Sequence, residues 1–75
     1  MINKEDEIRN VIEKIRPYIQ RDGGDVEYVS FTDGIVRVRL LGACMSIGDT
    51  LKDGIEAIIM DEIAGVSEVR LADEE

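Results

Sequence analysis

The spacing of apolar residues changes twice along this chain of 75 residues, and these changes constrain its fold more than any other feature. Between residues 5 and 20, apolar side chains recur every three or four positions, which places them on one face of a helix. They are Ile8, Val11, Ile12, Ile15 and Ile19. Pro17 predicts a kink rather than an end, because apolar residues continue beyond it. Gly23 and Gly24 predict the end, since glycine adopts the left-handed conformation that closes helices.

The middle of the chain changes to the spacing of strands. Residues 25–32 are rich in β-branched and aromatic side chains, and Asp33-Gly34 then gives a strong hairpin signal. Beyond this turn, apolar and charged positions alternate with a period of two. The apolar positions are Val36, Val38 and Leu40, and the charged ones are Arg37 and Arg39. Two antiparallel strands joined by a tight turn are therefore expected.

Helical spacing returns after residue 48. Asp49 or Ser46 is expected to cap a second helix, and Gly65 is expected to follow its end. Its apolar residues should share one face: Leu51, Ile55, Ile58, Ile59 and Ile63. Gly54 weakens this helix by about 1 kcal/mol relative to alanine, and its lack of a side chain would permit close packing there. Residues 66–71 alternate again and predict a third strand.

This order predicts an α+β domain of helix, strand, strand, helix and strand. The second helix forms a crossover, so the sheet should be three-stranded and mixed, with both helices on one face in two layers. A chain of this length forms a single domain, here 1–75 with an ordered core of about 5–71. Such a small domain buries roughly 60% of the surface of its unfolded chain, so a metal or a second subunit would add stability.

Charge and residue content exclude several functions. Seventeen acidic against nine basic residues give a net charge of -8, which disfavours nucleic acid and anionic membranes as partners. Histidine is absent, so the commonest general base is missing and a non-enzymatic role is expected. There is no apolar run of roughly 18 residues, and the polar, acidic beginning does not resemble a targeting signal. With one cysteine, the chain is expected in the reducing cytoplasm.

That cysteine, Cys44, is the first candidate for chemistry. It lies in a Gly-flanked connection just before a helix, where the helix N-terminus would favour the thiolate that binds iron-sulfur clusters, zinc or copper. A lone cysteine is also commonly a small buried apolar residue. Its neighbours Met45 and Ile47 either meet a partner or fold back onto the core.

The acidic residues offer weaker candidates. Asp22-Gly23-Gly24-Asp25 either binds a hard cation or forms a structural corner, and the corner is favoured because calcium needs roughly six to eight oxygen ligands. Asp61-Glu62 and the acidic residues 73–75 are expected to be solvated surface rather than acid-base catalysts.

Three segments resemble the NifU-like C-terminal domain of iron-sulfur cluster scaffold and carrier proteins. The first contains Arg16-Pro17 and Asp22-Gly23-Gly24-Asp25-Val26-Glu27, the second runs from Gly34 through Gly42-Ala43-Cys44, and the third is Thr50-Leu51-Lys52-Asp53-Gly54-Ile55-Glu56. They follow in the family's order over about residues 8–71. The resemblance implies the same fold and a role in iron-sulfur cluster assembly.

The resemblance also implies a Cys-x-x-Cys motif, through which two subunits hold one bridging four-iron four-sulfur cluster. Only Cys44 is present. Aligned from Gly42-Ala43, Cys44 takes the place of the first family cysteine and Ile47 that of the second. Aligned backward from Thr50, Cys44 takes the place of the second. A deletion of one cysteine and two spacers explains both flanks with one event and is the favoured interpretation.

A homodimer would then offer two thiolates where such clusters normally have four. Asp49 or a small thiol from solution would supply the missing ligands. Alternatively, a two-iron cluster would bind loosely between the subunits. The first hypothesis is therefore a NifU-like scaffold or carrier that binds a cluster through Cys44, weakened by the missing cysteine, as a homodimer or with an iron-sulfur acceptor or assembly protein. The alternative is an interaction module that keeps the fold without cluster binding. A thiol enzyme is least favoured, since histidine and a resolving cysteine are absent.

Overall fold

The computed structural model describes residues 3–42 and 48–72, with Asp49 described in its backbone only. Its elements follow in the predicted order: α1 (Lys4–Gln20), β1 (Gly24–Thr32), β2 (Ile35–Gly42), α2 (Gly48–Glu62) and β3 (Glu68–Leu71). β1 pairs antiparallel with β2, and β3 lies parallel to β2 on its other side. The predicted small α+β domain with a three-stranded mixed sheet is confirmed.

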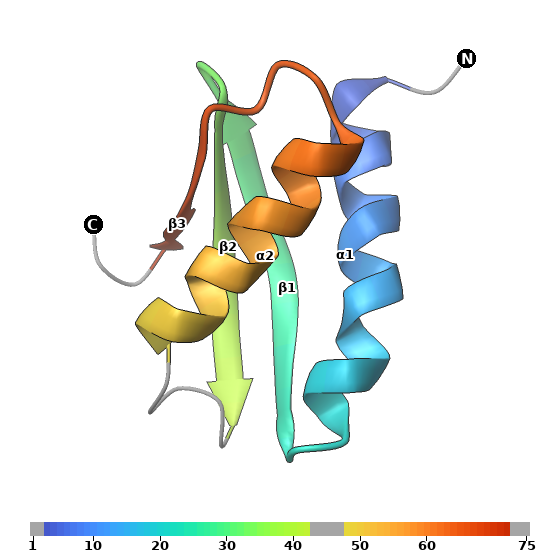
Figure 1. The fold of residues 1–75 in the computed structure, drawn as a ribbon, viewed down its shortest axis with the longest axis vertical. Helices are drawn as coiled ribbons and strands as arrows, with labels where there is room; N and C mark the ends of the chain where they lie inside the picture. The colour runs from blue at the N-terminus through green and yellow to red at the C-terminus, as the bar shows by residue number, and fades with distance from the viewer. Residues whose placement is uncertain (1–2, 43–47, 73–75) are drawn as a thin grey trace.

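Both helices pack against one face of the sheet, and α2 crosses in front of β2 while α1 lies beside β1 (Figure 1). The core between the two layers takes side chains from all five elements. α1 contributes the five residues that its spacing predicted: Ile8, Val11, Ile12, Ile15 and Ile19. The sheet contributes every second residue, namely Val26, Val36, Val38, Leu40 and Val69. Neither of the described helices lies on the opposite face of the sheet.

The hairpin turn follows the predicted Asp-Gly chemistry, and α1 has an asparagine cap that the sequence pattern did not predict. Asp33 and Gly34 have φ values of 55° and 80°, the left-handed conformations of a tight hairpin turn. Asn3 caps α1, because its side chain accepts a hydrogen bond from the backbone N–H of Asp6 at 2.9 Å. α1 continues through Pro17 to Gln20, so the proline does not end it.

A bulge in β1 breaks the expected alternation. Tyr28 pairs with Val38 and Ser30 pairs with Arg37, so Val29 is an extra residue in the ladder. Phe31 then returns to the core side, whereas Val29 is 38% exposed. The bulge thus adds an apolar side chain to the exposed surface, which the sequence pattern did not predict.

Three sequence expectations for the second half of the chain need correction. Ile58 does not share the buried face of α2 and is 43% exposed, since Ile55 and Ile59 already fill that face. Gly54 is not closely packed, because a Cβ atom there would have nothing within 4 Å. β3 begins at Glu68 rather than residue 66, and Ser67 instead donates its backbone N–H to Gly34 O at 2.7 Å.

Candidate functional site

The predicted ligand Cys44 lies outside the described residues, as do Met45, Ser46 and Ile47. The structure does describe the two elements that flank residues 43–47. β2 ends at Gly42 and α2 begins at Gly48. A Cβ atom on Gly48 would lie 3.3 Å from Leu71 Cδ1 and 3.6 Å from Leu40 Cδ1. The first turn of α2 is therefore packed against β2 and β3, which fixes where the chain re-enters the fold after Cys44.

The other flank, Gly42, lies against the turn that joins α1 to β1. Gly42 has a φ of 73° and pairs with Gly24 across the strands. A Cβ atom on Gly42 would lie 2.5 Å from Gly23 O, a distance that no side chain tolerates. The Asp22-Gly23-Gly24-Asp25 turn therefore lies directly against the end of the strand that leads to Cys44. This contact explains why glycine is needed at position 42, and the positive φ of 87° at Gly23 favours glycine in the turn.

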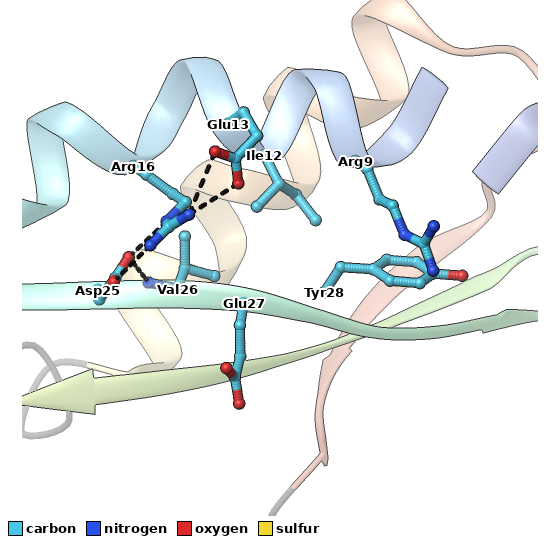
Figure 2. Close-up of a pocket in the computed structure, with 8 residues that line it drawn as sticks. All are labelled: Arg9, Ile12, Glu13, Arg16, Asp25, Val26, Glu27 and Tyr28. Carbon is cyan, nitrogen blue, oxygen red and sulfur yellow. Dashed lines mark hydrogen bonds and ion pairs between the residues drawn. The ribbon is translucent and has the colours of Figure 1, made fainter. Parts of the chain in front are cut away.

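Arg16 connects α1 to the start of β1 through a two-pronged ion pair (Figure 2). Its Nε and Nη2 donate to the two carboxylate oxygens of Asp25 at 2.8 and 2.9 Å, and its Nη1 donates to Glu13 at 2.9 Å. Asp25 Oδ1 also accepts the backbone N–H of Val26 at 2.7 Å. The hydrogen bonds from Arg16 and then from Val26 hold the pKa of Asp25 well below its usual value of 3.8. The hydrogen bonds to Asp25 and then to Glu13 raise the pKa of Arg16.

This pairing decides between the two interpretations of the Asp22-Gly23-Gly24-Asp25 turn. Both carboxylate oxygens of Asp25 already accept hydrogen bonds from a cationic side chain, so they are poorly available to a metal ion. Among residues 3–42 and 48–72, no group of three or more acidic, cysteine or histidine side chains is placed to hold a metal. The structural corner is therefore the better description.

A shallow groove of about 340 Å³ runs between α1 and β1 beside the Arg16–Asp25 pair. At its other end, the Arg9 guanidinium lies over the Tyr28 ring, 4.8 Å from the ring centroid (Figure 2). Burial is the main cause that raises the pKa of Tyr28. The groove is lined by charged groups that interact with each other or with an aromatic ring, so its polar groups serve the contact between helix and strand.

The third motif of the resemblance, at residues 50–56, lies within α2 and has its own structural contact. Glu56 Oε2 accepts the backbone N–H of Val69 at 2.9 Å. Val69 belongs to β3, which is an edge strand of the sheet. Glu56 therefore satisfies a backbone donor that would otherwise lack a strand partner, and it fixes α2 to β3.

Comparisons with known proteins agree with this arrangement. The family model described as "NifU-like domain" matches residues 8–70. The chain belongs to the NifU-like domain family. It is 45% identical over 62 residues to human "NFU1 iron-sulfur cluster scaffold homolog, mitochondrial", a match that covers 75% of this chain and 24% of the relative. It is 41% identical over 75 residues to "NifU-like protein 2, chloroplastic" from Arabidopsis thaliana, covering 95% of this chain and 32% of the relative.

A third relative is shorter. "Uncharacterized 10.3 kDa protein in vnfA 5'region" from Azotobacter vinelandii is 55% identical over 38 residues, which cover 51% of this chain and 40% of the relative. Each of these matches therefore covers less than half the length of the relative. Neither α1 nor α2, the helices that the structure describes, has the length and apolar character of a membrane span.

The sequence pointed to the Asp22-Gly23-Gly24-Asp25 corner but not to the two side chains that hold this corner and α2 in place. Arg16 and Glu56 both belong to the NifU-like motifs, yet their partners Asp25 and Val69 N–H lie nine and thirteen positions away in other elements. The residue spacing within one helix or strand cannot predict a contact between two different elements. The only signal in the sequence was their presence in motifs shared with the family.

Proposed function

We propose that this NifU-like domain assembles or carries an iron-sulfur cluster, which is its cargo and is bound through the Cys44 thiolate. The observation that supports this most is the family itself, since the human relative is named an iron-sulfur cluster scaffold homolog. Cys44 is the one thiol of the chain and follows directly on the β2 end that packs against the Asp22-Gly23-Gly24-Asp25 turn. Thiolates are the usual protein ligands of such clusters.

The number of ligands limits how well this chain holds its cargo. A four-iron four-sulfur cluster normally takes four cysteine thiolates, and two copies of this chain supply one each. We propose that a homodimer bridges the cluster and that a small thiol or another ligand completes the site. Bound in this way, the cluster is weakly held and easily passed to an acceptor or assembly protein, which suits a carrier more than a storage protein.

The proposed role also includes the absence of catalysis and a reducing compartment. The domain acts without catalysis, because the chain has no histidine to serve as general base. It works in a reducing compartment, which we take to be the cytoplasm, where a lone thiol remains available for iron.

Anaerobic reconstitution with ferrous iron, sulfide and a small thiol tests the proposal. The expected result is a brown protein with visible absorbance, bound iron, and the mass of a dimer on size exclusion. Cys44→Ser is expected to lose the iron and the dimer while its circular dichroism stays unchanged. A folded wild-type chain that binds no iron, or a Cys44→Ser variant that binds as much, would overturn the proposal.

The single cysteine also favours a second candidate, an interaction module that keeps the fold without cluster binding. It predicts that reconstitution leaves the wild-type protein colourless, and that binding to an iron-sulfur assembly protein, measured by pull-down with the purified partner, is unchanged in Cys44→Ser. Loss of the partner in that variant would instead support the carrier.

A further inference from the structure

The face of the sheet opposite the helices forms a separate surface, here called the open sheet face. Its side chains alternate along each strand with the buried core residues, apart from the bulge at Val29. We define it by residues of all three strands: Glu27, Val29 and Ser30 of β1, Arg37, Arg39 and Leu41 of β2, and Glu68 and Arg70 of β3. No described element covers it.

The charge of the open sheet face differs from that of the rest of the chain. It carries three of the nine basic residues but only two of the seventeen acidic ones. The face is therefore slightly positive, while the remainder of the molecule is more acidic than its net charge of -8 suggests. This segregation is not needed for folding, because outward positions on a sheet accept charges of either sign.

The strand register brings the arginines together. Arg37 lies directly beside Arg70 in the parallel β2–β3 pair, an arrangement of like charges that disfavours the sheet. The two glutamates are already engaged, since Arg39 pairs with Glu27 at 2.7 Å and Arg70 pairs with Glu68 at 3.0 Å. The hydrogen bond from Arg70 lowers the pKa of Glu68, and the nearby charges of Lys52 and Arg37 lower it further. Three cationic side chains, Arg37, Arg70 and Lys52, therefore lie near Glu68 at β3.

Two apolar side chains lie at the margins of the arginines. Val29 of the bulge and Leu41 near the end of β2 are each 38% exposed on the same side of the sheet. Leu41 immediately precedes Gly42, so the open sheet face extends to the strand end that leads to Cys44. Arginine combined with exposed apolar residues is a composition enriched in protein interfaces.

We propose that the open sheet face binds an acidic segment of a partner protein, whose carboxylates pair with Arg37, Arg39 and Arg70 and whose apolar side chains cover Val29 and Leu41. The charge complementarity supports a protein segment over nucleic acid. The described part of the face has no aromatic side chain on which a base would stack, and a long polyanion would also meet the strongly acidic remainder of the chain. A short segment feels mainly the local charges, because the Debye length is about 8 Å at physiological salt.

A titration of the ¹⁵N-labelled chain with a short synthetic peptide of glutamate and leucine tests this surface without any cluster. Amide shifts are expected at β2, β3 and the Val29 bulge, and binding should weaken as salt is raised. The same peptide with glutamine in place of glutamate is the neutral control, and oligothymidylate is the nucleic-acid control. Because the apo protein is used, the result does not depend on the proposed cluster binding.

Two double variants with equal charge change make the test specific. Arg37→Gln/Arg70→Gln removes two charges from the open sheet face and is expected to weaken peptide binding about fivefold or more. Lys14→Gln/Arg21→Gln removes two charges from the α1 side and is expected to leave the affinity within about twofold. Dispersed spectra show that each variant is folded. Equal weakening by both variants, shifts confined to the helices, no binding at low salt, or equally tight oligothymidylate binding would each overturn the proposal.

Discussion

Arg16 acts on two elements at once. Its guanidinium holds Glu13 one turn earlier on α1 and, through its other edge, both carboxylate oxygens of Asp25 on β1. A planar guanidinium fixes direction as well as distance in such a two-pronged pair. Together with the core packing, the Arg16–Asp25 pair therefore helps to fix the angle between α1 and β1, and with it the turn that packs against Gly42. This gives the Arg-Pro and Asp-Gly-Gly-Asp motifs a shared structural role at the turn that packs against Gly42.

The pair makes the stability of the domain sensitive to acid. Asp25 has a pKa below its unfolded value of 3.8, so its contribution is fully present above that value and is lost as the pH falls toward the folded pKa. Asp25→Asn is expected to lower the melting temperature at pH 7, and the difference from wild type should shrink steadily below pH 4. Thermal melts monitored by circular dichroism from pH 7 to pH 2 measure this.

Asp61→Asn, which removes an exposed carboxylate on α2, is the matched control. It should keep the acid dependence of the wild-type protein. If Asp25→Asn also keeps that dependence, Asp25 is not the group responsible.

Glu56 is expected to matter as a hydrogen-bond acceptor rather than as a charge. Glu56→Ala leaves the Val69 N–H of β3 without its acceptor and should destabilise the domain by about 1 to 2 kcal/mol. Glu56→Gln keeps a side-chain oxygen at the same reach and should cost clearly less. Urea denaturation of both variants gives the comparison, and equal losses would show that the charge, not the acceptor, supports β3.

At the scale of elements, α2 carries apolar residues on its exposed face as well as on its buried face, and the sequence pattern did not separate the two. Ile55 and Ile59 are buried, whereas Ile58 and Met60 are about 44% exposed. Gly54 lies in the middle of this helix with open space where a side chain would be. Neither its backbone conformation nor its surroundings in this chain require glycine.

Gly54→Ala is therefore expected to stabilise the domain by about 0.5 to 1 kcal/mol, because alanine loses less backbone entropy in a helix. Gly42→Ala is the opposite case, since Gly42 has a positive φ and its Cβ would meet Gly23 O at 2.5 Å. It should be strongly destabilising. Urea melts compare the two, and a loss of stability in Gly54→Ala would contradict the open space around it.

The elements were largely predictable because each one follows from local spacing. Helical spacing gave α1 and its five buried residues, and the Asp33-Gly34 signal gave the hairpin. The bulge at Val29 was not predictable, because the strand pattern of residues 25–32 reads equally well without it. The exposure of Ile58 was also not predictable. Ile55, Ile58 and Ile59 have helical spacing, but only Ile55 and Ile59 are buried. The site contacts of Arg16 and Glu56 needed the tertiary structure.

At the scale of the whole molecule, the two proposed activities occupy different parts of one small domain. The Cys44 segment connects β2 to α2, while the open sheet face lies on the side of the sheet away from both helices. Leu41 and Gly42 join them at one end of β2. A partner bound on the open sheet face would thus reach the end of β2 from which the proposed cargo-binding segment continues. The two proposed sites contain no residue in common and can be altered separately.

The number of cysteine thiolates is a property of the proposed dimer as a whole, because a bridging cluster takes its ligands from both copies. A variant with a cysteine and two spacer residues inserted between Ala43 and Cys44 restores both the Cys-x-x-Cys spacing and the longer connection. Its dimer would supply four thiolates, and reconstitution is expected to reach about two irons per chain. Ile47→Cys supplies the same number of thiolates in the shorter connection, and Thr32→Cys adds a thiol at the hairpin end of the sheet as the control.

Iron content and the mass of the cluster-bound dimer separate these variants. The favoured deletion predicts that the insertion binds the most iron, Ile47→Cys less, and Thr32→Cys no more than wild type. Equal binding by the insertion and Ile47→Cys would mean that thiol number alone limits the site and that connection length is unimportant. If Ile47→Cys exceeded the insertion, Cys44 would correspond to the first family cysteine, and the second would have been lost by substitution at Ile47.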